Sequence, residues 1–186
     1  MLWCALGNGA YRVVKKNYPL LILPALGIII LDQISKLAIQ NSVGIFESVP
    51  VIRGFFNIVH VRNRGIAFGF LNRLGSEYSA YLLIAATLVA IGLLVFWFTK
   101  FDKGQKGLTL GFSFILGGAV GNLIDRVRLH EVIDFLDFHI GQYHWPAFNV
   151  ADSAITVGTL WVAYIFLFRS PPILEGEKKE VSNIKA

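Results

Sequence analysis

Three long stretches of this chain contain no charged residue, and they constrain its fold more than any other feature. They are Tyr78–Thr99, Gly107–Ile124 and Ser153–Phe168. About 20 apolar residues in a helix cross the hydrocarbon core of a bilayer. The first stretch is long enough alone, and the other two reach that length when flanking polar residues lie at the interface or face the bundle. With 55% hydrophobic and 16% charged residues, the composition is that of a polytopic membrane protein.

A fourth span is predicted over Tyr18–Ile39, although this run contains Asp32 and Lys36. The two charges are four residues apart, so they can pair on one helical face. Basic residues precede the run and no small-residue cleavage site follows it, which predicts an uncleaved signal anchor. We expect one four-span domain over residues 18–169, between a cytoplasmic extension (1–17) and a polar cytoplasmic tail (170–186).

The net charge of +5 is explained by membrane topology and gives no support to nucleic-acid binding. Lys and Arg concentrate in cytoplasmic loops of membrane proteins. Four spans place both termini on one side, and that side holds ten basic residues against seven on the other. Both termini are therefore expected in the cytoplasm. Cys4 is the only cysteine, so it forms no internal disulfide and does not indicate a redox compartment.

Residues 41–77, between the first two spans, differ from the rest of the chain. Phe55–Val61 is rich in aromatic and β-branched residues and predicts a strand. Gly44–Ile52, interrupted by Pro50, is a second candidate, and Arg62–Gly65 has the residues of a turn. Open strand edges do not lie in lipid, so we expect a small extracytoplasmic sheet. Val127–Asn149, between the last two spans, is also expected mostly outside.

Four carboxylates lie on what this topology makes the outer side: Asp32, Asp125 and Asp152 at the ends of spans, and Asp134 in the connection between the last two spans. A charge at membrane depth is costly and by default marks a functional site. Carboxylates drawn together suggest shared-proton chemistry. Asp134 lies among apolar residues, which would raise its pKa by desolvation. Asp137, three residues on, is expected to be a solvated surface charge.

Asn122–Asp125 and Asn149–Asp152 share the pattern N-x-x-D, one closing the third span and the other opening the fourth. Residues three apart share a helical face, so both pairs can line one outer cleft. Structural readings remain open. Each Asn can form a hydrogen bond that holds two helices together, Asp152 can be a helix N-cap, and Asp125 can pair with the adjacent Arg126.

Other chemistries find less support. The four histidines show no metal-ligand spacing, and neither H-E-x-x-H nor G-x-S-x-G is present. We therefore expect no metal and no cofactor. The glycines of Gly117–Gly121 lie inside a span and predict close helix packing. A carboxylate-relay transporter is the main rival class, but Tyr78–Thr99 is almost free of polar side chains. A non-catalytic scaffold leaves the clustered carboxylates unexplained.

Five blocks in order resemble the lipoprotein signal peptidases, the type II signal peptidases of bacteria. They cover roughly Tyr18–Arg169, and together they are a far more specific signal than any one of them. The blocks are Asp32–Lys36, Arg62–Gly69, Gly117–Arg126, Val132–Phe135 and Phe148–Ser153.

The resemblance implies a mainly α membrane protein, with a four-transmembrane-helix bundle, a small extracytoplasmic β-cradle and an aspartyl protease site at the outer leaflet of the bacterial inner membrane. It implies cleavage of diacylglyceryl-modified prolipoproteins just before the lipidated cysteine, by a chain we expect to be monomeric and in contact with membrane lipids. The catalytic pair falls on Asp134 and Asp152. The supporting positions are Asp32, Lys36, Asn63, Gly65, Asn122, Asp125, Arg126 and Asn149.

Overall fold

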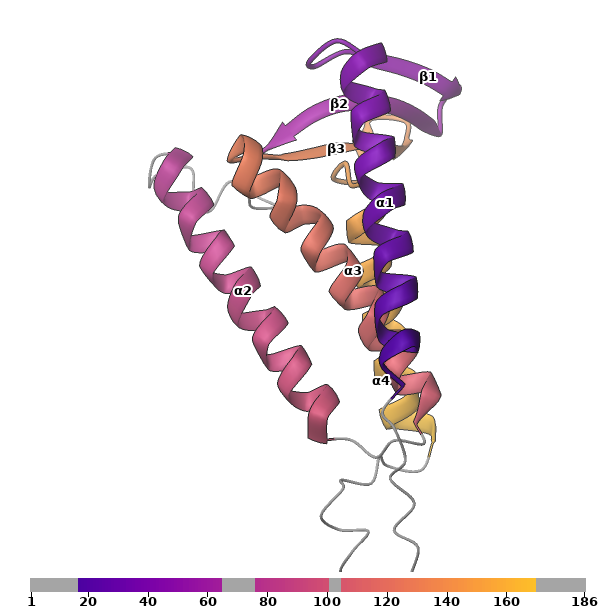
Figure 1. Ribbon diagram of the computed structural model, residues 1–186. Helices are drawn as coiled ribbons and strands as arrows, with labels where there is room; N and C mark the ends of the chain where they lie inside the picture. Colours follow the sequence, from indigo (N-terminus) through magenta and orange to yellow (C-terminus); the bar gives the residue numbers. More distant parts are fainter. Residues whose placement is uncertain (1–16, 65–75, 101–104, 170–186) are drawn as a thin grey trace, which may run out of the picture.

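The computed structural model describes residues 17–64, 76–100 and 105–169. Four helices and four strands are found there (Figure 1). In chain order they are α1 (Tyr18–Ser42), β1 (Ser48–Ile52), β2 (Phe56–Asn63), α2 (Ser76–Lys100), α3 (Lys106–Leu129), β3 (Val132–Ile140), β4 (Tyr143–His144) and α4 (Val150–Phe168).

All four helices are long and apolar enough to cross a membrane, which confirms the predicted number of spans. Helices α1, α3 and α4 pack together, and α2 lies along α3 at the side of the bundle (Figure 1). Large apolar side chains on the helices point outward, among them Leu23, Leu31, Val89, Leu160 and Leu167. A bilayer solvates such side chains, whereas an aqueous surface this apolar would drive association.

Close packing of α3 against its neighbours depends on residues that lack a side chain. A Cβ atom on Gly118 would collide with the carbonyl oxygen of Ala151 in α4. A Cβ atom on Gly121 would lie 2.7 Å from Oδ2 of Asp32 in α1. The prediction of close helix approach at Gly117–Gly121 is therefore confirmed, and this approach brings three helices to one polar site.

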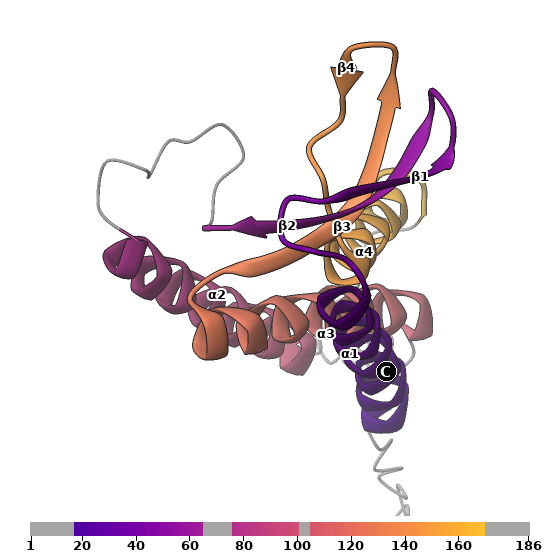
Figure 2. The same cartoon turned by 90° about the horizontal axis from the view of Figure 1, so that it is seen from above.

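The strands form one antiparallel arrangement in the order β1-β2-β3-β4, at one end of the helix bundle (Figures 1 and 2). The predicted strand Phe55–Val61 overlaps β2, and the second candidate, Gly44–Ile52, contains β1. The turn expected from Arg62 was wrong at its first two residues, because Arg62 and Asn63 continue β2 and pair with β3. Pro50 is tolerated because β1 is an edge strand of this arrangement. β3 was not predicted, although it is the longest strand and pairs with both β2 and β4.

The opposite end of the bundle is closed by apolar side chains. Leu21 of α1, Phe98 of α2, Leu108 and Phe112 of α3, and Ile165 of α4 form one buried cluster. These residues lie near the ends of their helices that are farthest from the sheet (Figure 1). Apolar packing thus holds one end of the bundle, while polar contacts hold the end that faces the sheet.

Candidate active site

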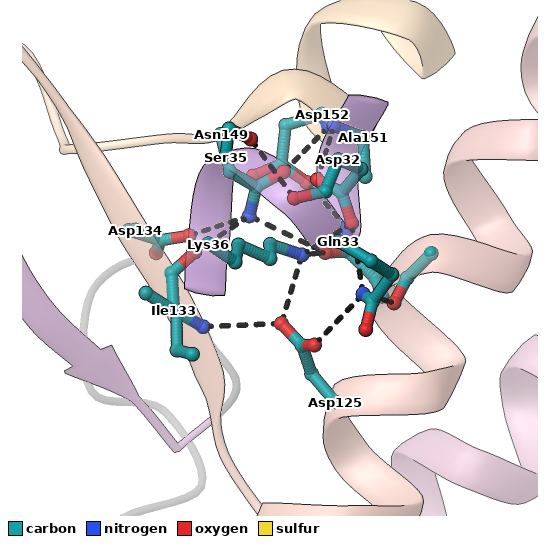
Figure 3. Close-up of polar contacts among 12 residues, drawn as sticks. Asp32, Gln33, Ser35, Lys36, Asp125, Ile133, Asp134, Asn149, Ala151 and Asp152 are labelled. Carbon is teal, nitrogen blue, oxygen red and sulfur yellow. Dashed lines mark hydrogen bonds and ion pairs between the residues drawn. The ribbon is translucent and has the colours of Figure 1, made fainter. Parts of the chain in front are cut away.

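Polar side chains from α1, α3, β3 and the start of α4 meet at the sheet end of the bundle (Figure 3). Most of them are fully enclosed: Asp32 and Asn149 are 0% exposed, Asp125 and Asp134 2%, and Asn122 4%. Burying a charge is costly unless it is paired and hydrogen-bonded, so the partners of each group determine whether this arrangement is stable. The structure brings together all four carboxylates that the sequence singled out.

Lys36 neutralises two of the carboxylates at once. Its Nζ lies 2.8 Å from Oδ2 of Asp32, one helical turn earlier in α1, and 2.8 Å from Oδ2 of Asp125 in α3. It also donates to Oδ1 of Asn122 at 3.0 Å. The predicted Asp32–Lys36 pair is confirmed. The alternative prediction that Asp125 pairs with Arg126 is wrong. Among the described residues, Asp125 forms its ion pair with Lys36.

These two carboxylates also fix the backbone of neighbouring elements. Oδ1 of Asp32 accepts the backbone N–H of Ala151 at 2.9 Å, at the start of α4. Oδ2 of Asp125 accepts the backbone N–H of Ile133 at 3.3 Å, at the start of β3. Asp32 and Asp125 are therefore joined to the two segments that carry Asp152 and Asp134.

Gln33 completes this arrangement and was not predicted from the sequence. Its Nε2 lies within 3.2 Å of Asp32 Oδ2 and the carbonyl oxygen of Gly121, and 3.1 Å from Asp125 Oδ1. The available signal was its place beside Asp32 in the first block of the resemblance, where only the charged residues were given a role.

Asn149, and not Asp152, is the N-cap of α4. Its Oδ1 accepts the backbone N–H of Asp152 at 2.9 Å, which satisfies one of the free donors of the first turn. The alternative reading of Asp152 as the N-cap is therefore wrong. Asp152 instead lies within the first turn, where the helix dipole favours a negative charge.

The two asparagines of the N-x-x-D pairs connect the two remaining carboxylates. Nδ2 of Asn149 donates to Oδ1 of Asp134 at 2.8 Å, and Nδ2 of Asn122 donates to Oδ1 of Asp152 at 2.7 Å. The asparagines also contact each other, since Asn149 Nδ2 lies 3.3 Å from Asn122 Oδ1. Each asparagine thus bonds an aspartate that lies outside its own N-x-x-D pattern through its amide nitrogen. Together the two asparagines hold Asp134 and Asp152 at one site.

Asp134 is able to retain a proton near neutral pH. Burial is the largest cause, and together with the charge of Asp152 it raises the pKa of Asp134 to about 7, against hydrogen bonds from Asn63 and Asn149 and the charge of Lys36. The contact from Asn63, at the end of β2, is 2.9 Å. A carboxyl group of this kind can exchange a proton during catalysis at physiological pH.

Arg126 lies close to the same site, and the carboxylates of Asp152, Asp134 and Asp125 all act electrostatically on its guanidinium. Its Nε is buried and has no hydrogen-bond partner among the described residues. Gly65, another expected supporting position, lies outside the described residues, as do residues 66–69 of the same block.

Asp137 is not the solvated surface charge that was expected from the sequence. It is 7% exposed and accepts hydrogen bonds from Asn57 on β2 and His144 on β4. Burial opposes its ionisation, but the contacts with His144, Asn57 and His139 outweigh burial and hold the pKa of Asp137 below its ordinary value. The expectation failed because the strand β3 was not predicted, and with it the enclosure by β2 and β4.

Four helices able to span a membrane, with buried carboxylates and amides collected under a small sheet at one end, define a polytopic membrane protein with a polar site at one bilayer surface. Two solved structures have the same architecture, both described as bacterial membrane enzymes solved by the in meso method, at 2.3 and 1.9 Å resolution. Their TM-scores are 0.73 and 0.72, each at 34% identity. The first covers 82% of this chain and 90% of its own, and the second 84% and 97%.

The family model for signal peptidase (SPase) II matches residues 24–168. A lipoprotein signal peptidase of Oleidesulfovibrio alaskensis is 50% identical over 135 residues, 73% of this chain and 86% of the relative. One of Nitratidesulfovibrio vulgaris is 42% identical over 152 residues, 82% and 91% of the two chains. The chain belongs to the signal peptidase II family. It is accordingly a protease and a multi-pass protein of the bacterial inner membrane.

Proposed function

We propose that this protein is an aspartyl endopeptidase that removes the signal peptide from diacylglyceryl-modified prolipoproteins, cutting just before the lipidated cysteine. The observation that carries the proposal is the pair formed by Asp134 and Asp152, held at one site by Asn149 and Asn122. The substrate follows from the name of the relatives, which are lipoprotein signal peptidases.

The reaction needs one proton shared between the two carboxyl groups. Two neighbouring carboxylates do not both ionise cheaply, so the active form has one ionised and one protonated. The ionised group removes a proton from water, whose oxygen attacks the scissile carbonyl. The protonated group stabilises the developing oxyanion and then helps protonate the leaving amine. The pair titrates as a unit, so its macroscopic pKa values belong to both residues.

The supporting residues divide into two groups by what they contact. Asn63, Asn122 and Asn149 bond the reacting carboxyl groups directly and set their orientation and charge. Asp32, Lys36 and Asp125 bond one another and the backbone of α4 and β3, so they position the segments that carry the pair. Arg126, whose Nε has no partner among the described residues, is suited to bind a carbonyl group of the substrate backbone.

A substrate that is both peptide and lipid requires an apolar surface on the bundle. Between α3 and α4, about one to four helical turns beyond Asp152 toward the end far from the sheet, lies a groove of about 540 Å³ lined by aliphatic and aromatic side chains, including Phe114, Val157 and Trp161. An acyl chain or a signal helix would lose little by moving from the bilayer to this groove. The sheet above the helices offers backbone edges to an extended peptide near the cut.

The test is cleavage of a synthetic lipidated precursor by purified protein, followed by a gel shift. Asp134→Asn and Asp152→Asn keep size and hydrogen bonding but cannot exchange a proton, so each is expected to abolish cleavage while the protein stays folded and inserted. Turnover near wild type in either variant would exclude this pair. Asp137→Asn is the matched control because it is a buried aspartate of the same strand outside the pair, and it should retain cleavage.

Cleavage is also expected to continue in EDTA or phenanthroline and after treatment with serine- or cysteine-directed reagents. Among the described residues that bond Asp134 and Asp152, none is a histidine or a thiol. Loss of cleavage on chelation, restored by added zinc, would overturn the aspartyl mechanism in favour of a metal-activated water.

A further inference from the structure

A second group of ionisable side chains lies on the outer sheet, away from the Asp134–Asp152 pair. Asp137 and His139 of β3 and His144 of β4 each offer one ligand atom, and these atoms all lie within 4.8 Å of one another. The hairpin register produces this arrangement, because His139 lies directly opposite His144 and Asp137 is two residues earlier on the same face of β3. The two imidazole rings are stacked, with centroids 4.6 Å apart.

The carboxylate of this group is already oriented by its neighbours. Asn57, which lies opposite Asp137 on β2, donates from Nδ2 to Asp137 Oδ2 at 2.9 Å. Nδ1 of His144 lies 2.9 Å from Asp137 Oδ1. The side chains of Asp137 and His139 are about one-tenth exposed, whereas that of His144 is 51% exposed. The group is therefore enclosed on the side of β2 and open to solvent at His144.

The spacing of the histidines along the chain predicted no metal site, because His139 and His144 are brought together only by the β3–β4 hairpin. We propose that Asp137, His139 and His144 bind one divalent first-row transition metal ion, of which Zn²⁺ is the representative. Two imidazoles and a carboxylate are ligands that zinc takes, and imidazole favours such ions over Ca²⁺ and Mg²⁺. Ligand atoms around tetrahedral zinc lie about 3.3 Å apart, given bonds of about 2.0–2.1 Å. Nδ1 of His144 already lies 2.9 Å from Asp137 Oδ1, whereas Nδ1 of His139 lies 4.0 Å from Asp137 Oδ2. Binding therefore requires a small movement of the His139 or Asp137 side chain as well as rotation of the exposed His144, and water completes the coordination.

The proposed ion has no part in peptide cleavage. Asp137 and Asp134 are three residues apart on β3, so their side chains point to opposite faces of the strand. The ion would instead tie β4 to β3. β4 has only two residues, and its pairing with β3 is limited to His139–His144 and Ile140–Tyr143. A bound ion would therefore stabilise the hairpin that leads toward the start of α4.

The test uses the full chain, purified in detergent through an affinity tag without histidine, in a Cys4→Ser background that removes the only thiol. Zinc binding is measured by competition with a chromophoric chelator, and Co²⁺ is added separately to observe its visible absorption. We expect one ion per chain. His139→Ala and His144→Ala should each weaken zinc binding by more than about 100-fold, and Asn57→Ser by about 10- to 100-fold as an outer partner.

The control is His130→Asn, which removes a histidine outside the group. His130 has a left-handed backbone conformation that asparagine tolerates, and zinc affinity should not change. Circular dichroism and precursor cleavage in EDTA establish that every variant is folded and active, so a failure of the metal site is distinguished from a failure of the proposed function. Equal zinc affinity in wild type and both histidine variants would overturn the proposal and leave Asp137 and His144 as a hydrogen-bonded pair only.

Discussion

Lys36 is the residue on which the buried carboxylates depend. It is 2% exposed and lies 2.8 Å from both Asp32 and Asp125, so one ammonium group compensates two negative charges. A buried ion cluster of this kind does not of itself add much stability. Removing its cation, however, leaves uncompensated charges in an apolar environment, which is among the most costly changes a protein interior can undergo.

Lys36→Met keeps the approximate volume of the side chain and removes its charge. We expect it to lower the free energy of unfolding by about 3–5 kcal/mol, the usual cost of breaking a buried pair. Thermal unfolding in detergent measures the effect. Lys100→Met, at the exposed end of α2, is the control and should change stability by less than about 0.5 kcal/mol. Equal stability of both variants would mean that Lys36, Asp32 and Asp125 are solvated.

In the proposed mechanism, Asn63 tunes the titration of the pair formed by Asp134 and Asp152. Its hydrogen bond favours the ionised form of Asp134, whose pKa burial raises to about 7. The active pair holds one proton, so kcat/KM should fall as the pH rises through about 7 and the last proton is lost. Asn63→Ala removes a bond to the ionised form, raises that pKa, and should move the falling limb to higher pH. A limb that stays in place or moves to lower pH would contradict this role.

At the scale of elements, the helices could be predicted because lipid imposes a simple rule. Uncharged runs such as Tyr78–Thr99 and Ser153–Phe168 have to be helical, since no other open structure satisfies its backbone in a bilayer. β2 could be predicted from its aromatic and β-branched residues. β3 could not, because its sequence includes Asp134, Asp137 and His139, and carboxylates are uncommon in strands.

Only the part of the candidate site that depends on local sequence could be predicted. Asp134 and Asp152 were singled out by the sequence blocks that resemble the family, and the Asp32–Lys36 pair by helical spacing within one segment. The partners that join separate elements could not be read from spacing. These include Lys36 with Asp125, and Asn122 with Asp152. Such contacts depend on how closely α3 approaches α1 and α4, which the sequence indicates only through its glycines.

Gly118 provides the test of that close approach. In Gly118→Ala the new Cβ would collide with the carbonyl oxygen of Ala151, a backbone atom that moves only if α3 and α4 separate. Overpacking of this kind costs about 1–3 kcal/mol, and separation should also reduce cleavage by displacing Asp152. Stability and turnover are measured together in detergent.

Gly92→Ala in α2 is the matched control, since in the described part of the chain no atom outside its own stretch of helix lies within 4 Å of the position that its Cβ would take. It should leave cleavage unchanged and slightly favour the helix. If Gly118→Ala behaved in the same way as Gly92→Ala, the helices would not be held at the separation seen here.

At the scale of the whole molecule, the two ends of the bundle have different roles. The end near Leu21 and Phe98 is closed by apolar packing, and the end near Asp32 and Asp125 carries the polar site and the sheet. The proposed cleavage requires this asymmetry, because water would have to reach Asp134 and Asp152 while the rest of the bundle stays in lipid. The function therefore depends on which way the molecule is inserted.

The orientation follows from the basic residues, which favour the cytoplasm. Ten of the seventeen are on the side that holds both termini in a four-span chain. We therefore expect the start of α3 at Lys106 to be cytoplasmic, and Ser76, at the sheet end of α2, to face outward (Figure 1).

A reporter fused after Lys106 should behave as cytoplasmic, as should one fused after Ala186, and one inserted near Ser76 should behave as external. The lipidated cysteine of an exported precursor would then meet Asp134 and Asp152 at the outer leaflet without either crossing the bilayer. The reverse pattern would place the carboxylates on the cytoplasmic side, across the bilayer from the lipidated cysteine of an exported precursor. The proposed substrate would then have to be abandoned.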